Sequence, residues 1–395
     1  MRIGIDGGCM ANRRGFGRFA RQMVKALAEA DSPHEFTVFI DRPSRDAVEI
    51  PARFRTIEVS VREAPSQAAS STGRRGLADL FAMGRAVARA RVDLMYFPAT
   101  YSFFPVWGCR RVVVTMHDTL ALAHPEWVFP GGKGRLAWKL KEHAAVRRAD
   151  RVVTVSEAAR RDLIAWFRLD PDRVRVVSEG PDAAFRPTTA GPESDAALRR
   201  YGIGPGSRFL LYVGGLSPHK NLARLIEAFA RVPENVALVL VGDFGDVFHT
   251  HVPDLRAAVD RFGLGGRVAF TGFVPDEELV YLYGRAYALV QPSLMEGFGL
   301  PPVEAMACGT PVLSSRAGSL PEVIGAAGAF FDPFDVEAMA GVLGTTLADP
   351  AGRDRLAGLA LDRARRYTWA ASARALLDVF DGLDPTVAMT LGTAA

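Results

Sequence analysis

Short apolar runs alternate with amphipathic stretches along most of the chain, and this alternation predicts its secondary structure. Runs typical of buried parallel strands occur at residues 3–6, 36–40, 94–97, 112–115, 152–155, 209–213, 237–241, 268–271, 288–291 and 311–314. Helical periodicity lies between such runs, as at residues 16–28, 221–231 and 280–284. Strands that alternate with helices form parallel sheets covered on both faces. Two such series predict an α/β fold with two Rossmann-like domains.

The predicted boundary between the two domains falls within residues 186–207, which are rich in Pro, Gly and Ser and have weak periodicity. We therefore assign residues 1–187 to an N-terminal domain and residues 188–366 to a C-terminal domain. The small, polar residues 64–76 predict a surface loop. Residues 386–395 lack charge and periodicity, so we expect residues 384–395 to form a tail.

The chain length also favours two domains, because single cores stop growing at about 250–300 residues and this chain has 395. It is 49% hydrophobic and 23% charged, as in soluble globular enzymes. No apolar run reaches the ~18–20 residues that span a bilayer, and the N-terminus lacks the layout of a signal peptide. The three cysteines are scattered, without zinc or redox spacing. We expect a cytoplasmic protein.

Positive charge is concentrated in the first half of the chain. Residues 1–200 hold 33 Lys and Arg against 23 Asp and Glu, whereas residues 201–395 hold 15 against 21. A basic half can meet an anionic lipid surface, an anionic acceptor or nucleic acid, and the alternative is an ordinary Arg-rich surface. The helical segment 133–148 combines basic residues with Leu136, Trp138 and Leu140. It is our candidate for peripheral contact with an anionic membrane, and a basic surface helix is its alternative.

The strongest candidate for chemistry is segment 288–318, which begins with a predicted strand. A Gly-rich turn leads into Pro301-Pro302, which opens a helix. A helix start offers free N–H groups and the positive end of the helix dipole, which suit a diphosphate. Glu296 lies in the turn and Glu304 one turn into the helix. Both can face the crevice at the carboxyl end of the sheet, and the alternative is a βα turn with two surface glutamates.

The spacing of Glu296 and Glu304 resembles the E-x7-E signature of glycosyltransferase family 4, whose members are retaining enzymes with the GT-B fold. The resemblance implies two Rossmann-like domains that face each other across a cleft. It also implies that Glu296 binds hydroxyls of the donor sugar and that Glu304 binds the ribose hydroxyls of the nucleotide. Backbone N–H groups in between hold the sugar and the diphosphate, and here they belong to Phe298, Gly299 and Leu300.

A second motif, 214–221, follows the strand predicted at 209–213. A glycine turn between a strand and a helix can cradle an anion, and Gly215 lies in this turn. Lys220 adds a mobile cation that can follow a departing diphosphate. Related family 4 enzymes have a similar turn with a lysine and usually an arginine beside it. His219 stands at the expected arginine position, so a clamp of two cations is in doubt, and a surface lysine is the alternative for Lys220.

The resemblance extends to four shorter segments. His117, in a T-x-H-D segment after a strand, would lie near the donor sugar and support the reaction centre, although a lone histidine is more often structural. Gly15 and Gly17 open the first long helix and would approach the donor phosphates. Val274 would contact the nucleotide base through its backbone, and Gly242 would line the nucleoside pocket.

The remaining features concern the C-terminus and metals. Residues 363–380 resemble the last helix of GT-B enzymes, which crosses back to the N-terminal domain, and we place it at about 367–383. Asp170-Pro171-Asp172 mimics a D-x-D metal motif, but we expect it to lead into a strand at 174–177. GT-B enzymes generally need no bound divalent metal, so neither a metal nor a cofactor is expected.

These features predict a retaining hexosyltransferase of polysaccharide biosynthesis that uses a GDP- or UDP-sugar. Its catalytic residues would be His117, Lys220 and Glu296, and the form of segment 212–221 suggests mannose as the sugar. The acceptor would be a hydroxyl of a growing glycan or a lipid-linked sugar at the inner face of the membrane, and no nucleic-acid partner is expected. Two alternatives stay open: a nucleotide-sugar epimerase or phosphorylase on the same fold, and a non-catalytic nucleotide-binding protein. An NAD-linked dehydrogenase is disfavoured, because the G-x-G-x-x-G spacing is absent.

Overall fold

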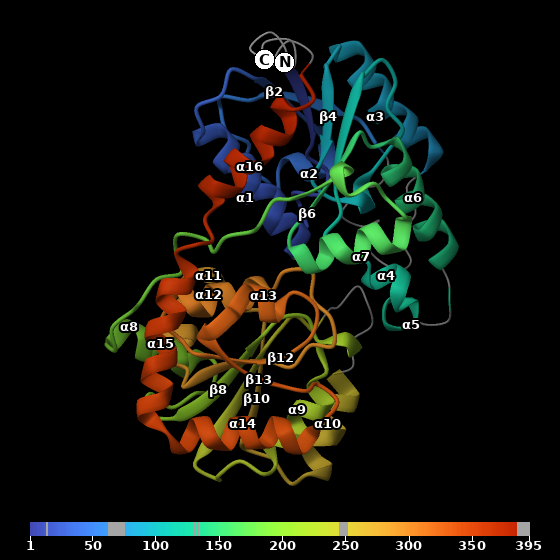
Figure 1. Cartoon of the computed structure of the whole chain (residues 1–395). Coiled ribbons are helices and arrows are strands. Elements are labelled where there is room, and N and C mark those ends of the chain that lie inside the picture. Colours follow the sequence, from blue (N-terminus) through green and yellow to red (C-terminus); the bar gives the residue numbers. More distant parts are fainter. Residues whose placement is uncertain (13–14, 62–75, 130–131, 133, 245–251, 385–395) are drawn as a thin grey trace, which may run out of the picture. The chain divides into compact units, whose positions relative to one another are not determined.

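The computed structural model describes residues 1–12, 15–61, 76–129, 132, 134–244 and 252–384 (Figure 1). The chain divides into an N-terminal unit, Met1–Glu179 with Trp369–Ala395, and a C-terminal unit, Gly180–Thr368. The predicted loop 64–76, apart from Gly76, and the predicted tail from 385 onward lie outside the described residues. Among the described helices, none is long and apolar enough to cross a membrane.

The N-terminal unit is built on a parallel sheet of seven strands in the order β3-β2-β1-β4-β5-β6-β7. The strands are β1 (Arg2–Asp6), β2 (Glu35–Asp41), β3 (Arg55–Val59), β4 (Leu94–Phe97), β5 (Arg111–Thr115), β6 (Arg151–Thr154) and β7 (Val174–Val176). The helices are α1 (Gly15–Glu29), α2 (Arg42–Arg45), α3 (Leu77–Ala90), α4 (Leu120–Ala123), α5 (Pro125–Val128), α6 (Arg135–Arg148), α7 (Glu157–Phe167) and α16 (Trp369–Asp381). Helices α3, α6 and α7 share one apolar core with the sheet.

The C-terminal unit is built on a parallel sheet of six strands in the order β10-β9-β8-β11-β12-β13. The strands are β8 (Arg208–Val213), β9 (Val236–Val241), β10 (Val268–Gly272), β11 (Ala288–Gln291), β12 (Val312–Ser315) and β13 (Gly328–Phe331). The helices are α8 (Pro192–Arg200), α9 (Leu222–Phe229), α10 (Val252–Arg261), α11 (Asp276–Arg285), α12 (Leu300–Ala307), α13 (Leu320–Ile324), α14 (Val336–Ala348) and α15 (Pro350–Ala364).

Both sheets reverse their strand order at one point, between β1 and β4 in the N-terminal unit and between β8 and β11 in the C-terminal unit. Loops that leave neighbouring strands in opposite directions open a crevice at the carboxyl edge, which is where such sheets bind ligands. The predicted α/β architecture is confirmed. Two strands escaped prediction, because half-exposed β3 sits at a sheet edge and β13 has a half-buried pattern.

The last helix, α16 (Trp369–Asp381), lies within the predicted range of about 367–383, but the whole stretch 363–380 is not one helix. Helix α15 ends at Ala364 and α16 begins at Trp369. Side chains hold the break in place: Arg363 Nε and the Tyr367 hydroxyl both donate to the Val323 carbonyl, at 2.8 and 3.1 Å. Helix α16 then packs on α1, where the Trp369 ring meets the Phe19 ring at 5.8 Å.

The division between the units falls at Glu179–Gly180, several residues before the interval 186–207 in which we expected it. The chain joins the C-terminal unit early because Phe185 is buried there. Its ring packs edge-on against Tyr283 of α11, with 5.6 Å between ring centroids. The Pro- and Gly-rich residues that suggested the boundary therefore belong to the C-terminal unit.

Candidate functional site

The central feature of the C-terminal unit is an ion pair at the point where its strand order reverses. Lys220 lies in the turn after β8, and Glu296 lies in the turn after β11, the neighbouring strand. Lys220 Nζ is 2.7 Å from Glu296 Oε1, and the two side chains are only 17% and 13% exposed. Two residues predicted from separate motifs thus meet at the carboxyl edge of one sheet.

The carboxylate of Glu296 is held by more than the lysine. Gln291 Nε2 and Ser293 Oγ donate to the same oxygen, at 2.8 and 2.7 Å. Burial by itself would raise the pKa of Glu296, but the positive charge of Lys220 and these hydrogen bonds hold it below its ordinary value. The side chain is therefore ionised, fixed in direction and ready to accept hydrogen bonds from hydroxyl groups.

The backbone around Glu296 is fixed by the turn after β12. Gly318 has a φ of +55°, and a Cβ there would lie 2.5 Å from the Glu296 carbonyl oxygen, so only glycine fits. The Ser319 hydroxyl donates to the carbonyls of Glu296 and Phe298, at 3.1 and 2.8 Å. The sequence contained no clear signal for these two positions, because their partner lies more than 20 residues away.

Helix α12 begins at Leu300, one residue before Pro301, with which the sequence predicted it to open. Gly299 precedes it with a φ of +102°, which favours glycine, and Leu300 is its first residue. Pro301 and Pro302 have no N–H, and Val303 N donates to the Gly299 carbonyl at 3.4 Å. The N–H groups that this helix start can offer to an anion are therefore those at or before Leu300, including Phe298.

Glu304 is almost fully buried, on the first turns of α12. It accepts a hydrogen bond of 2.9 Å from the hydroxyl of Tyr283, and the Tyr283 carbonyl accepts one of 2.6 Å from Thr310. Tyr283 is a partner of Glu304 that the sequence analysis missed, since a tyrosine on an amphipathic helix is typical of a core position. The structure places Glu304 on the same turn-and-helix unit as Glu296.

Three glycines align at the carboxyl ends of β8, β9 and β10. Gly214 N donates to the Val241 carbonyl at 3.0 Å, and Gly242 N donates to the Gly272 carbonyl at 3.1 Å. A Cβ on Gly242 would lie 2.3 Å from the Gly214 carbonyl oxygen, so this close approach requires glycine. Beside them the Gly215 carbonyl accepts a 2.6 Å hydrogen bond from Tyr212, and Val274 is buried.

His219 and Asn221 flank the lysine and have different roles. Burial, together with the positive charge of Lys220, lowers the pKa of His219 to about 3, so its ring is uncharged at neutral pH. His219 therefore cannot replace the arginine of related enzymes as a second cation. Asn221, which the sequence analysis passed over, has a φ of +60° and donates to the carbonyls of Pro292 and Pro333, at 3.1 and 2.7 Å.

The residues predicted from the first half of the chain gather within the N-terminal unit. His117 follows β5; its Nε2 is 3.1 Å from the Pro98 carbonyl oxygen, and its Nδ1 is 3.4 Å from Glu179 Oε1. Because a carbonyl only accepts, Nε2 carries a proton. The ring is enclosed by the rings of Phe16 and Phe19, at 4.9 and 4.7 Å. Glu179 is a partner that sequence reasoning missed.

The two glycines of the first helix differ in their surroundings. A Cβ on Gly17 would lie 1.8 Å from the Asn12 carbonyl oxygen, so the close approach of the preceding loop demands glycine there. A Cβ on Gly15 would have open space around it. Packing by itself thus explains Gly17, whereas no neighbour among the described residues restricts a side chain at Gly15.

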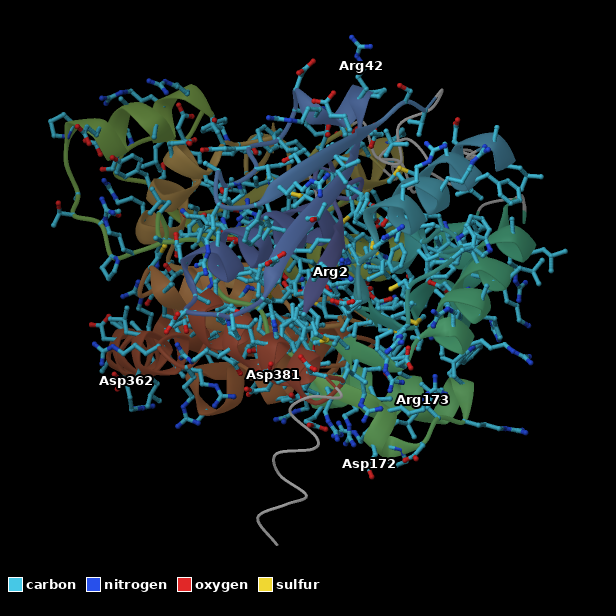
Figure 2. All side chains as sticks on the ribbon, turned by 90° about the horizontal axis from the view of Figure 1, so that it is seen from above. Arg2, Arg42, Asp172, Arg173, Asp362 and Asp381 are labelled. Atoms are coloured by element: carbon cyan, nitrogen blue, oxygen red, sulfur yellow. The ribbon has the colours of Figure 1, made fainter. Side chains whose placement is uncertain are left out.

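The apparent D-x-D motif has a structural role. The Asp170 carboxylate accepts a hydrogen bond of 2.9 Å from Asp172 N and caps a short 3-10 turn, Pro171–Arg173, that leads into β7. Figure 2 shows Asp172 at the surface beside Arg173, and its side chain is 87% exposed. The Asp172 carboxylate forms an ion pair with Arg175, at 3.7 Å.

Comparison with known proteins identifies the family. Residues 194–360 match the glycosyl transferases group 1, and residues 13–185 match Glycosyltransferase Family 4. The chain is 33% identical over 276 residues to O-antigen chain mannosyltransferase B of Escherichia coli, covering 68% of this chain and 69% of that protein. The chain therefore belongs to the glycosyltransferases that these two descriptions cover, glycosyl transferases group 1 and Glycosyltransferase Family 4. The predicted family and the prediction of a glycosyltransferase are confirmed, and the epimerase, phosphorylase and non-catalytic alternatives find no support.

Further relatives bear on fold and length. Serotype-specific mannosyltransferase WbdA of Escherichia coli is 30% identical, but the match covers only 34% of its length. Sucrose-phosphate synthase from Thermosynechococcus elongatus has a TM-score of 0.77 at 24% identity, covering 97% of this chain and 99% of that one. Anabaena HepE, in complex with UDP-glucose, has a TM-score of 0.74 at 21% identity, covering 97% and 100%. These solved structures show that the glycosyltransferase has the GT-B fold.

Proposed function

We propose that this glycosyltransferase moves a hexose from a nucleotide-diphosphate sugar to a hydroxyl group with retention of configuration. The observation that carries the proposal is the ion pair of Lys220 and Glu296, held at the strand-order reversal beside the start of α12. A site that combines a cation, a helix start and a fixed carboxylate suits a ligand that is anionic at one end and rich in hydroxyls at the other.

The roles divide along the donor. Glu296, with one oxygen already engaged by three donors, uses its remaining capacity to accept from sugar hydroxyls. Glu304 binds the ribose hydroxyls while Tyr283 fixes its direction. N–H groups at or before Leu300 bind the diphosphate, and Val274 and the glycines after β8 and β9 line the nucleoside pocket. His117 supports the reaction centre.

The chemistry is the exchange of one bond at the anomeric carbon. The bond to the diphosphate oxygen breaks with its electron pair going to that oxygen, and a bond to the acceptor oxygen forms on the same face of the sugar. The acceptor proton passes to the departing phosphate oxygen. Lys220 and the helix start stabilise the negative charge that develops on the diphosphate, and His219 adds none because it is uncharged. No divalent metal takes part in this scheme.

The names of the relatives narrow the choice of donor sugar and of acceptor. O-antigen chain mannosyltransferase B and WbdA are mannosyltransferases by name, which favours mannose, whereas HepE binds UDP-glucose. We take GDP-mannose as the first donor to test and UDP-glucose as the second. An acceptor that is a growing glycan or a lipid-linked sugar agrees with the O-antigen relatives.

The first experiment measures thermal stabilisation by UDP, GDP, dTDP and ADP. A nucleotide present at 100 times its Kd stabilises the protein by about 2.7 kcal/mol. At equal concentrations, the nucleotide with the lowest Kd therefore raises the melting temperature most. Release of free nucleotide from the matching sugar donor then shows turnover, and NMR of the glycosidic product shows whether configuration is retained. Inversion would refute the retaining assignment.

Variants test the site itself. Removal of one electrostatic group in an active site lowers turnover by about 100–1,000-fold, so Lys220→Ala and Glu296→Gln should each do so while folding is kept. The matched control is the exposed pair Arg231–Glu337, which has the same 2.7 Å length on the surface of the same unit. Glu337→Gln should turn over normally. Near-normal turnover in the Lys220 or Glu296 variant would remove the proposal.

Membrane contact completes the proposal, because a lipid-linked acceptor lies at a membrane. The sequence pointed to residues 133–148, and α6 does expose Leu136 and Leu140. However, Trp138 is buried, and the Lys141 and Arg148 side chains donate to the carbonyls of Tyr101 and Cys109. Part of the amphipathic face expected on α6 is therefore used inside the N-terminal unit, so we do not place the membrane contact on α6.

A further inference from the structure

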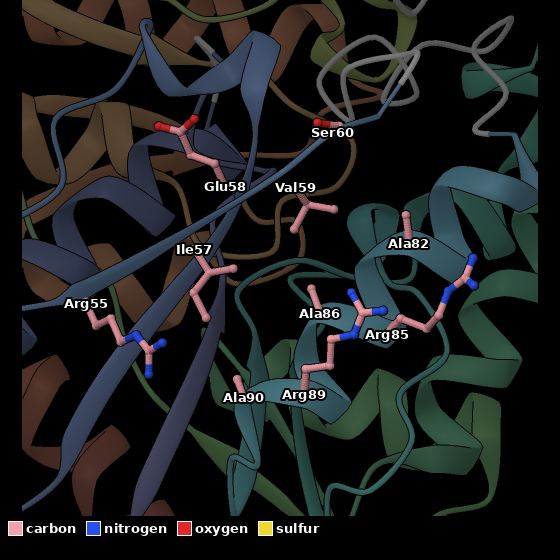
Figure 3. Close-up of a pocket in the computed structure, with 10 residues that line it drawn as sticks. All are labelled: Arg55, Ile57, Glu58, Val59, Ser60, Ala82, Arg85, Ala86, Arg89 and Ala90. Carbon is pink, nitrogen blue, oxygen red and sulfur yellow. The ribbon is translucent and has the colours of Figure 1, made fainter.

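Helix α3 and the edge strand β3 of the N-terminal unit enclose a hollow of about 480 Å³ (Figure 3). Its floor is apolar: Ile57 and Val59 of β3 face a row of alanines on α3. The alanines are Ala82, Ala86 and Ala90. Because these side chains are small, the helix does not fill the space above the strand, and the hollow stays open to solvent.

Three arginines stand around this hollow: Arg55 on β3, and Arg85 and Arg89 on α3. None of the three forms an ion pair with any described carboxylate. Glu58, the acid that lines the hollow, pairs instead with Arg45 at 3.8 Å. Three guanidinium groups that have no ion-pair partner among the described residues, against the one carboxylate of Glu58, create a positive potential that favours a phosphate-bearing ligand.

The same helix and the loop before β5 together present an exposed apolar group near these arginines. Leu77, Phe81 and Trp107 are 73%, 49% and 42% exposed, and the last two rings stack in parallel with 5.5 Å between centroids. The Trp107 ring lies against Gly84 of α3, where a Cβ would be 2.2 Å from it. Glycine inside a helix lowers helix stability, but here it makes room for the ring of Trp107, which remains partly exposed to solvent.

We infer that this face, the α3 surface, docks on the headgroup layer of an anionic phospholipid bilayer. It comprises Leu77, Phe81, Arg85, Arg89, Trp107 and Arg55. Lipid phosphates bind the three arginines, and the aromatic pair with Leu77 enters the boundary between headgroups and acyl chains, where tryptophan and other apolar side chains are favoured. A free phosphate would satisfy the arginines but leaves the exposed apolar group unexplained, so the bilayer accounts for more of the surface.

The test uses the full chain and vesicles of phosphatidylcholine with or without 30% phosphatidylglycerol, in co-sedimentation at low and high salt. Each arginine near an anionic surface contributes about fivefold to binding, so R85Q/R89Q should weaken binding to the anionic vesicles about 25-fold. L77Q/F81Q should also weaken it. The matched control on α6, L136Q/L140Q, should bind as the unaltered protein does.

Several results would overturn the inference. Unaltered binding of R85Q/R89Q, or loss of binding in the α6 control alone, would place the contact elsewhere. Equal binding to vesicles with and without phosphatidylglycerol would remove the role of the arginines. Stabilisation by inorganic phosphate that needs Arg85 and Arg89, without vesicle binding, would make the hollow a free-phosphate site. Nucleotide-induced stabilisation, measured in every variant, reports the donor site separately, so either proposal can fail alone.

Discussion

A double-mutant cycle on Lys220 and Glu296 is the sharpest test of how the site is built. At 2.7 Å and an effective dielectric of 20, the two charges attract by about 6 kcal/mol before the cost of desolvation is subtracted. Removing one partner of a buried pair typically costs about 3–5 kcal/mol. Since both side chains keep some exposure and Gln291 and Ser293 still donate to Glu296, we expect Lys220→Met to cost about 2–3 kcal/mol.

The double variant K220M/E296Q should recover part of this loss, because it leaves no uncompensated charge. The coupling energy should be about 2 kcal/mol at pH 7. Its pH dependence follows from the lowered pKa of Glu296: the contribution is complete above the ordinary value of 4.5 and is lost as pH falls through the folded pKa. The difference in the free energy of unfolding between the unaltered protein and K220M should therefore become smaller at acid pH.

The assay is urea unfolding of the four proteins at pH 7 and at the lowest pH where all remain folded. The C-terminal unit must be followed by its own probe, because two units need not unfold in one step. A coupling energy below about 0.5 kcal/mol, as is common for surface pairs, would show that the pair is not the buried anchor described here. A coupling energy that increases at acid pH would refute the predicted direction of the pH dependence.

Three further predictions follow from single contacts. Tyr283→Phe removes a hydrogen bond to buried Glu304 worth about 1.5–3 kcal/mol, so nucleotide should stabilise the variant less in a thermal-shift assay while saturated turnover changes little; unchanged affinity would remove Tyr283 from the site. Gly242→Ala places a Cβ 2.3 Å from the Gly214 carbonyl oxygen and should cost about 3 kcal/mol in urea unfolding, whereas Gly265→Ala, in open space, should be neutral; equal effects would contradict the close approach. Burial raises the pKa of Glu142 to about 8, so the stability of the unaltered protein falls as pH rises from about 4.5 to 8. Glu142→Gln should avoid roughly 4 kcal/mol of that loss between pH 5 and 9, and parallel curves of stability against pH for the two proteins would disprove this.

Much of the fold could be predicted because its information is local. Strands buried on both faces must be continuous apolar runs, and the helices between them must be amphipathic, so β4 and β11 were predicted with the bounds that the structure has. Edge strands break this rule: β3 keeps Arg55 and Glu58 exposed and was missed. The end of α15 was missed as well, because Arg363 and Tyr367 stop the helix through bonds to distant Val323.

For the site, the sequence by itself determined which residue types stand at the ends of strands: Lys220 after β8, Glu296 and Glu304 after β11, and His117 after β5. Strand order decided the rest. Because β8 and β11 are neighbours although β9 and β10 lie between them in the chain, Lys220 meets Glu296, and Tyr283 reaches Glu304. Likewise, only packing shows that His219 is uncharged and that Glu179 faces His117. Burial and long-range pairing are properties of the assembled sheet, and no local pattern encodes them.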